Sequence, residues 1–201
     1  MIKEHILEKQ KRVRQKIIVV ASSVFNKYGF KKATIEDIAK TAGMGKSSIY
    51  YYFKSKEDIF EAVVEQEAIE LNLELTEKVI NTNDNPKEKV KNYVLIRMKF
   101  LKEMVNFFEA LKDDYLRNLP FTIRIRKKYD KQEQQMLSKI FNEGVSQDIF
   151  YLNNIEFTAL ALVTFLKGLE SSLIINEEME YADLEENLDR ILEVIFHGIL
   201  K

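Results

Sequence analysis

The chain has 201 residues, of which 46% are hydrophobic and 31% charged, so it can bury a sizeable core and is not of the disordered class. It has no cysteine, which excludes disulfides, thiolate metal sites and thiol nucleophiles. The net charge of −1 conceals an asymmetry: residues 1–56 hold thirteen Lys and Arg against four Asp and Glu, a balance of +9, so the other 145 residues carry −10. A basic end on an acidic body is typical of a chain that binds a polyanion, although solvated basic termini are also common.

The sequence pattern predicts an all-α protein. Only two prolines and six glycines interrupt it, and no sustained β-branched alternation indicates a strand. The charged start, from Met1 to His5, is unlike a signal peptide. The most apolar stretch, Phe157 to Leu166, is about half as long as a membrane span and is followed by Lys167. We therefore expect a cytoplasmic protein without a membrane segment.

The first helix is predicted to begin within the polar residues 1–12 and to continue to about Tyr28. Its apolar stripe starts at Val13 and recurs at helical spacing. Gly29 follows, and its freedom to adopt a positive φ suits the residue after a helix end. The side opposite the stripe is basic and forms either a phosphate contact or a solvated face, through Lys11, Arg12, Arg14 and Lys16.

Two short helices joined by a glycine turn are predicted between Thr34 and Phe53. Thr34 is placed to be the N-cap of the first helix, and Asp37, three residues later, is a carboxylate partner for a capping box. The apolar face of this helix consists of Ile35, Ile38, Ala39 and Ala42. Gly43 can end the helix with a positive φ, and Gly45 can cap the next one.

The second short helix is predicted over Lys46 to Phe53. Its packing side carries Ile49, Tyr52 and Phe53. Its other sides, facing outward or sideways, carry Ser47, Ser48, Tyr50 and Tyr51. A short helix that packs through three apolar residues and presents small polar and aromatic groups can enter a DNA major groove.

A long helix is predicted next, from an N-cap at Ser55, with Asp58 as the acidic partner at N3, to about Val79. The polar run 81–85 breaks it. A three-helix head is thus expected to be joined to a helical body by this long helix, without a flexible linker.

The body is predicted to consist of further helices. Asn85 and Pro86 give a well-specified helix start as N-cap and N1 residue, and Gly144 is predicted to stop a later helix. The helices are expected at about 86–103, 105–118, 121–143, 154–175 and 183–200.

The last two predicted helices, about 154–175 and 183–200, carry more apolar surface than one core would cover. The first is apolar nearly all round, and the second has apolar residues outside its main stripe. Two such helices from each of two subunits would form an intermolecular four-helix bundle, so we expect a homodimer through them. The alternative is that the rest of the body covers both helices.

The sequence shows no catalytic or metal-binding constellation. The two histidines, His5 and His197, lie near opposite ends, and no H-E-x-x-H, phosphate-binding glycine loop or G-x-S-x-G is present. We therefore expect no enzyme activity, no metal and no cofactor, although scattered residues can converge in a fold.

The stretch from about Ile17 to Phe60 closely resembles the DNA-binding head of TetR-family transcriptional regulators. The family pattern F-x-x-x-G-[FY]-x-x-[AT]-[ST]-[IV]-x-[DE]-I-A is met by Phe25, Gly29, Phe30, Ala33, Thr34, Ile35, Asp37, Ile38 and Ala39. The pattern A-G-[VM]-x-x-x-x-[LI]-Y-x-[YH]-F-x-[SN]-K-E is met by Ala42, Gly43, Met44, Ile49, Tyr50, Tyr52, Phe53, Ser55, Lys56 and Glu57. The resemblance implies a DNA-binding helix-turn-helix domain at 1–56 and a ligand-binding and dimerisation domain at 57–201.

The resemblance also implies which side chains contact DNA. Thr34, at a helix N-terminus, would meet a phosphate. Base edges would be reached by Lys46, Ser47, Ser48 and Tyr51, and phosphates by Tyr50, Lys56 and Lys54. Gly45 stands where the family commonly has Ser, and Tyr51 where it commonly has His, so the base sequence that this helix reads stays open.

A regulator of this kind would bind a palindrome in double-stranded DNA as a homodimer, as a repressor or, alternatively, an activator. A small apolar or amphipathic effector in the body would shift the long helix and release the DNA. Its pocket is expected among side chains that could equally fill the core: Met98, Leu101, Met104, Phe107, Phe108, Leu111, Tyr115, Tyr129, Met136 and Phe141. The rival hypotheses are a helical enzyme or carrier with a vestigial head, and a protein-interaction adaptor.

Overall fold

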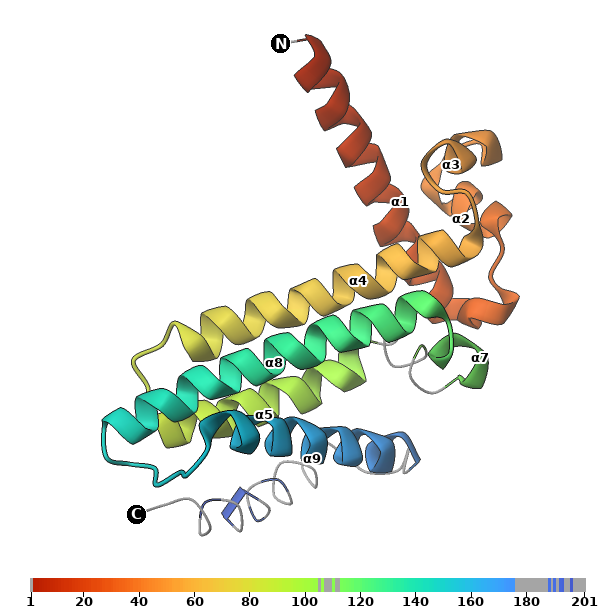
Figure 1. Ribbon diagram of the computed structural model, residues 1–201. Helices are drawn as coiled ribbons and strands as arrows, with labels where there is room; N and C mark the ends of the chain where they lie inside the picture. The colour runs from red at the N-terminus through yellow and green to blue at the C-terminus, as the bar shows by residue number, and fades with distance from the viewer. Residues whose placement is uncertain are drawn as a thin grey trace. The chain divides into compact units, whose positions relative to one another are not determined.

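A computed structural model of the chain describes residues 2–104, 106, 110, 113–175, 188, 190, 192, 193 and 196. The predicted all-α fold is confirmed: every secondary-structure element of several residues in this described part of the chain is a helix (Figure 1). The chain divides into two compact units. The first unit comprises Met1–Ala68 and Met104–Thr122, and the second comprises Ile69–Glu103 and Ile123–Lys201.

The first unit begins with a long helix, α1 (Ile2–Lys32), which is kinked at Gly29. Gly29 has φ 72°, the positive value that the sequence predicts at this helix end. The short helices α2 (Ile35–Ala42) and α3 (Lys46–Tyr52) follow, and then the first part of α4 (Lys56–Leu75). In Figure 1, α3 lies beside α2, and the N-terminal part of α1 extends beyond both.

Four phenylalanine rings form the centre of the first unit. Phe60, on α4, is 1% exposed, and its ring centroid lies 5.1 Å from that of Phe25 and 4.8 Å from that of Phe30. Phe121 adds a fourth ring at 6.3 Å from Phe60. Edge-to-face packing of this kind adds to the free energy that burial of the rings provides. The cluster therefore fixes the start of α4 against both sides of the Gly29 kink.

The segment Met104–Thr122 is held to α1 and α4 by polar contacts. The buried Asn106 side chain donates to Ser22 Oγ at 3.1 Å and to Glu67 Oε1 at 2.6 Å. Lys31 pairs with Asp113 at 2.7 Å. Much of the helix that we predicted at 105–118 lies outside the described residues, which show helical backbone at Asn106, at Ala110 and in the short helix α7 (Asp114–Arg117).

The second unit is a set of packed helices. The end of α4 passes into a π-helical turn, η1 (Thr76–Ile80), before α5 (Pro86–Glu103), most of α8 (Pro120–Ser146) and α9 (Ile155–Ile175). Asn85 caps α5 by accepting from the Lys87 N–H at 2.8 Å, as predicted. The core that these helices enclose includes Val90, Tyr93, Met98, Leu137, Phe141 and Leu166.

Gly144 does not stop its helix, so that prediction is wrong. α8 continues to Ser146, and Gly144 lies inside it with Phe150 folded back against it. A Cβ atom added at Gly144 would lie 2.1 Å from Phe150 Cδ2, closer than real contacts allow. The turn instead uses the positive φ of Asp148. Gly144 is therefore required for a close approach and not for chain reversal.

We expect Gly144→Ala to lower the free energy of unfolding by about 1–3 kcal/mol, because the new methyl group displaces the Phe150 ring. Phe150→Ala alone should cost about 3–5 kcal/mol by opening a cavity. In the double variant the methyl group enters the vacated space, so the two losses should not add. Urea unfolding of the three variants measures this coupling, and strictly additive losses would contradict the close contact.

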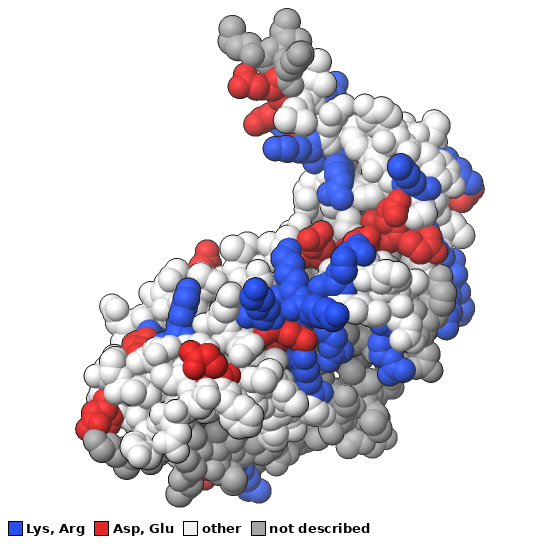
Figure 2. Space-filling view, viewed as in Figure 1, with Lys and Arg blue, Asp and Glu red and all other residues white. Residues whose placement is uncertain are grey.

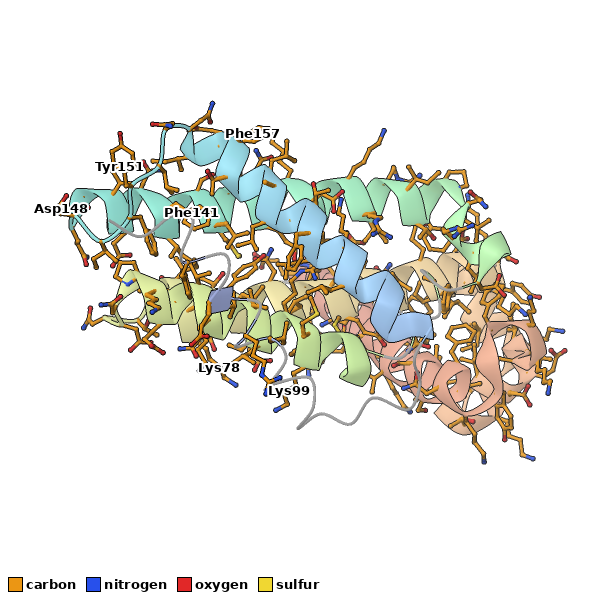
Figure 3. All side chains as sticks on the ribbon, turned by 90° about the horizontal axis from the view of Figure 1, so that it is seen from below. Lys78, Lys99, Phe141, Asp148, Tyr151 and Phe157 are labelled. Carbon is orange, nitrogen blue, oxygen red and sulfur yellow. The ribbon has the colours of Figure 1, made fainter. Side chains whose placement is uncertain are left out.

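The outer face of α9 is apolar and exposed. Phe157 is 66% exposed and Leu160 48%, whereas Ala159 and Val163 on the other face are buried. Figure 3 shows α9 lying across α8 and α5, with Phe157 at its start and Tyr151 in the preceding loop. Of the predicted helix at 183–200 the structure describes only five residues, of which Leu188, Leu192 and Phe196 are buried. In the described part of the chain no helix is long and apolar enough to cross a membrane.

Candidate nucleic-acid interface

The start of α2 is fixed by a reciprocal capping box, as the sequence predicts. Thr34 Oγ1 accepts a hydrogen bond from the Asp37 N–H at 3.2 Å and donates to Asp37 Oδ2 at 2.6 Å. The Thr34 N–H also donates to that carboxylate, at 3.0 Å. These hydrogen bonds lower the pKa of Asp37, the hydroxyl of Thr34 contributing most. A carboxyl group whose pKa is lowered by folding stabilises the fold at pH values above its pKa in the unfolded chain. This contribution is lost as the pH falls through the pKa of the folded state.

The turn between α2 and α3 depends on Gly43 and Gly45. Gly43 has φ 66°, and its N–H donates to the carbonyls of Ala39 and Lys40. Gly45 is the N-cap of α3 and, having no side chain, makes no side-chain cap. Two buried side chains, Ile49 at 0% exposure and Phe53 at 4%, anchor α3 to the unit. The apolar packing therefore holds α3 from one side only.

The opposite side of α3 is open to solvent. Tyr50 is 46% exposed and Tyr51 69%, and Ser47 and Ser48 are also exposed. The hydroxyl groups of these four residues can donate to or accept from base edges and phosphates. The structure thus brings four of the predicted DNA-contacting side chains together on one helix of seven residues.

Lys46, at the start of α3, forms an ion pair with Glu36 of α2. The hydrogen bond between them raises the pKa of Lys46 and lowers the pKa of Glu36. Both side chains are exposed, so water screens this pair. The ammonium group also lies 6.0 Å from the centroid of the Tyr50 ring. Glu36 therefore positions Lys46 beside the open face and competes with any phosphate or base for its charge.

The two remaining predicted contacts, Lys54 and Lys56, have different surroundings. The Lys54 side chain is exposed after α3. Lys56 Nζ donates to the carbonyl of Phe30 at 2.7 Å and to that of Ala33 at 3.0 Å, and lies 4.4 Å from the centroid of the Phe30 ring. Its hydrogen bonds thus satisfy one backbone carbonyl in the last turn of α1 and one between α1 and α2, a structural role that the sequence did not reveal.

We expect Lys56→Ala to lower the free energy of unfolding by about 1–3 kcal/mol, because two carbonyl groups lose a charged donor. Lys54→Ala is the matched control and should change stability by less than about 0.5 kcal/mol. Thermal unfolding of both variants, followed by circular dichroism, makes the comparison. Equal stability of the two proteins would show that the Lys56 hydrogen bonds contribute nothing.

Sequence reasoning missed the contacts that α1 makes with the helix-turn-helix. The Gln10 side chain donates to the Tyr51 hydroxyl at 2.9 Å. The Arg14 guanidinium group lies 4.9 Å from the centroid of the Phe53 ring, and Lys16 Nζ donates to the Ala42 carbonyl at 2.8 Å. The spacing of Gln10, Arg14 and Ile17 on one helical face was the available signal.

Comparison with known proteins agrees with this geometry. Residues 17–63, which span much of α1, the two short helices and the start of α4, match the sequence model described as Bacterial regulatory proteins, tetR family. The chain belongs to the TetR family. It is a DNA-binding transcriptional regulator, as the resemblance of its sequence implied.

Longer similarities extend beyond the matched region. The solved transcriptional regulator from Cytophaga hutchinsonii is 29% identical, with a TM-score of 0.80 over 92% of this chain and 97% of that one. The HTH-type transcriptional repressor KstR2 of Mycolicibacterium smegmatis is 25% identical over 139 residues, 68% of this chain and 67% of the relative. FadR from Bacillus subtilis, solved in complex with stearoyl-CoA, has a TM-score of 0.72 at 20% identity over 92% and 98% of the two chains.

The predicted effector-pocket residues of this TetR-family chain fall into three groups. Met98, Tyr129 and Phe141 are buried in the second unit, and Met136 is half-buried there. Met104 is buried in the first unit. The side chains of the others lie outside the described residues: Leu101, Phe107, Phe108, Leu111 and Tyr115. Phe141 packs against Phe150, with their ring centroids 5.9 Å apart.

Buried charges in the second unit are a feature that the sequence analysis missed. Arg97 of α5 pairs with Glu133 of α8, and both side chains are buried. Lys89, two turns earlier on α5, donates to Glu143 at 2.8 Å. The signal in the sequence was the spacing of four residues between Lys89, Tyr93 and Arg97, which places them in one polar row on a helix face. The core of this TetR-family protein is therefore amphipathic.

Proposed function

We propose that this regulator is a cytoplasmic, homodimeric repressor that binds a palindromic operator and is released from it by a small amphipathic molecule. The observation that carries the proposal is the one-sided anchoring of α3: Ile49 and Phe53 are buried, and the opposite face is exposed. A helix held in this way can enter a major groove with its open face against the base edges. KstR2, which the chain resembles over two thirds of its length, is named a repressor.

The roles of the α3 residues follow from their positions. We assign base contacts to Lys46, Ser47, Ser48 and Tyr51, and phosphate contacts to Tyr50 and Lys54. Thr34 would present the N-terminus of α2 to a phosphate. Lys56 is assigned to the stability of the turn between α1 and α2, since two backbone carbonyls accept its hydrogen bonds.

A dimer is supported by the exposed apolar face of α9. In a homodimer this face, with Phe157 and Leu160, would be covered by the same face of the partner together with the final helix. Two recognition helices about 34–36 Å apart would then read one face of B-DNA at two half-sites. The symmetry of the dimer requires a palindromic operator.

Effector release is supported by the continuity of α4, which contributes residues to both compact units. The segment Met104–Thr122 belongs to the first unit although the helices before and after it belong mainly to the second. Its residue Asn106 is hydrogen-bonded to α1 and α4. Repacking of the second unit around a ligand can therefore change the positions of the DNA-reading helices. Bound DNA must then lower the affinity for the ligand by the same factor by which the ligand lowers the affinity for DNA.

The chemistry of the second unit favours an amphipathic effector. Apolar side chains such as Met98 and Phe141 would contact its hydrophobic part, and the buried Arg97–Glu133 pair offers charges for a polar group. FadR binds stearoyl-CoA within the same fold, which is consistent with a ligand of this class.

Selection of bound sequences from random duplex DNA tests the proposal directly. We expect enrichment of an inverted repeat, with affinity that falls steeply as salt rises. Tyr51→Ala and Lys46→Ala should relax the base preference at the positions they read, each by about 1–3 kcal/mol. Absence of any sequence preference in the wild-type protein would contradict the proposal.

A further inference from the structure

The N-terminal part of α1 forms a helical arm, residues 2–14, that continues past the packed part of the first unit. The described side chains before residue 17 are exposed or half-buried, and the first fully buried one is Ile17. Ile6 and Leu7, for example, are 51% and 53% exposed. At 1.5 Å per residue the arm is roughly 20 Å long. This is more helix than the core of the unit needs.

One hydrogen bond sets the arm beside the recognition helix. Gln10 donates to the hydroxyl of Tyr51, the most exposed tyrosine of α3. One turn further along, Arg14 lies over the ring of Phe53, the residue that follows α3, so two successive turns of the arm contact α3 and its C-terminal end. Any duplex that reaches the open face of α3 at Tyr51 therefore also comes close to the arm.

The arm is basic. Residues 2–14 contain five Lys and Arg against two Glu, a balance of +3. Figure 2 shows Lys and Arg side chains along it, with acidic ones nearer its tip. Of these five, Arg14 is engaged with the Phe53 ring, and Lys16, just beyond the arm, donates to the Ala42 carbonyl. The exposed charges available to an external partner thus include Lys9, Lys11 and Arg12.

Their positions around the helix distinguish these three. At about 100° per residue, Lys9 and Lys11 flank Gln10 on its two sides, whereas Arg12 lies about 200° away, on the opposite side from α3. Arg12 is also within 3.7 Å of the Glu8 carboxylate. The edge of the arm that adjoins Tyr51 therefore carries Lys9 and Lys11 but not Arg12.

We propose that the arm is a second DNA-contacting element, in which Lys9 and Lys11 bind backbone phosphates next to the groove that α3 reads. Gln10 acts as a positioning residue that orients the Tyr51 hydroxyl. Given the length of the arm, these phosphates lie within roughly six base pairs of that groove, at 3.4 Å per pair. The inference rests on the proposed DNA-binding function of α3.

The test compares three variants of the full-length protein on its selected operator. Lys9→Ala combined with Lys11→Ala should make the slope of log affinity against log salt shallower by about 1.8 to 3.6, for one or two lost phosphate contacts in each of the two subunits. The base preference should not change, because phosphates carry no sequence information. Gln10→Ala should do the reverse: it should relax the preference at the bases near Tyr51 and leave the salt slope unchanged.

Arg12→Ala is the matched control, since it removes one arm charge from the side away from α3. Its salt slope should equal that of the wild type. Ethylation interference on the operator should show phosphates that the wild type needs and the double variant does not. If the wild type binds its operator specifically and the double variant keeps its slope and its interference pattern, the arm is not a DNA contact. Absence of specific binding by the wild type would instead overturn the proposed function itself.

Discussion

Replacing Phe60 with alanine is expected to lower the free energy of unfolding by about 3–5 kcal/mol, the usual cost of removing a buried aromatic ring. Phe60 is 1% exposed and contacts three other rings, so its removal leaves a cavity that the neighbouring side chains do not fill. The total free energy of unfolding of most small domains is only about 5–15 kcal/mol. The first unit should therefore be largely unfolded under mild denaturant, and operator binding should be lost with it.

Hydrogen exchange resolved along the chain is the suitable measurement, because the two compact units need not unfold together. Protection should fall in α2, α3 and the start of α4, with less change in α5 and α8. Phe60→Leu, which keeps most of the volume, should cost under about 1.5 kcal/mol. Tyr28→Ala, at a ring that is 45% exposed, is the aromatic control and should cost little. A Phe60→Ala protein as protected as the Tyr28→Ala protein would disprove the central role of the cluster.

The helix-turn-helix was predictable because local signals determine it. The Thr34–Asp37 box, the positive φ of Gly43 and the burial of Ile49 each follow from residues within four positions of one another. Family resemblance then added what spacing alone leaves open, namely that the exposed side of this helix pair meets DNA. Charge asymmetry pointed in the same direction without identifying any contact.

The errors and omissions arise where distant residues meet. The sequence predicts a helix stop at Gly144 because many helices end at a glycine, but contact with Phe150 decides its role. Lys56 reaches carbonyls more than twenty residues earlier in the chain, and Gln10 bonds to Tyr51 forty-one residues later. Helical spacing places Tyr28 on the apolar stripe of the first helix, yet this residue is 45% exposed, one position before the kink at Gly29. Such contacts depend on tertiary packing, which no local pattern encodes.

The outer face of α9 provides the second large expected effect. Phe157→Asp combined with Leu160→Asp places two charges on the face that we assign to the dimer interface. Burying unpaired carboxylates there is prohibitive, so the protein should sediment as a monomer. Both positions are exposed within one chain, so the helical content should be retained.

Loss of the dimer should weaken binding to the full palindrome by about 10²–10⁴-fold, because the second head no longer binds intramolecularly at high effective concentration. Affinity for a single half-site should be unchanged, since α3 is intact. The matched control is Ile69→Asp with Leu73→Asp, two apolar residues 39% and 56% exposed on α4, which should stay dimeric. Sedimentation and operator titration of both pairs give the answer. If the α9 variant stays dimeric and binds the palindrome fully, the interface lies elsewhere; if only its palindrome binding falls, α9 sets the spacing of the two recognition helices and not the association itself.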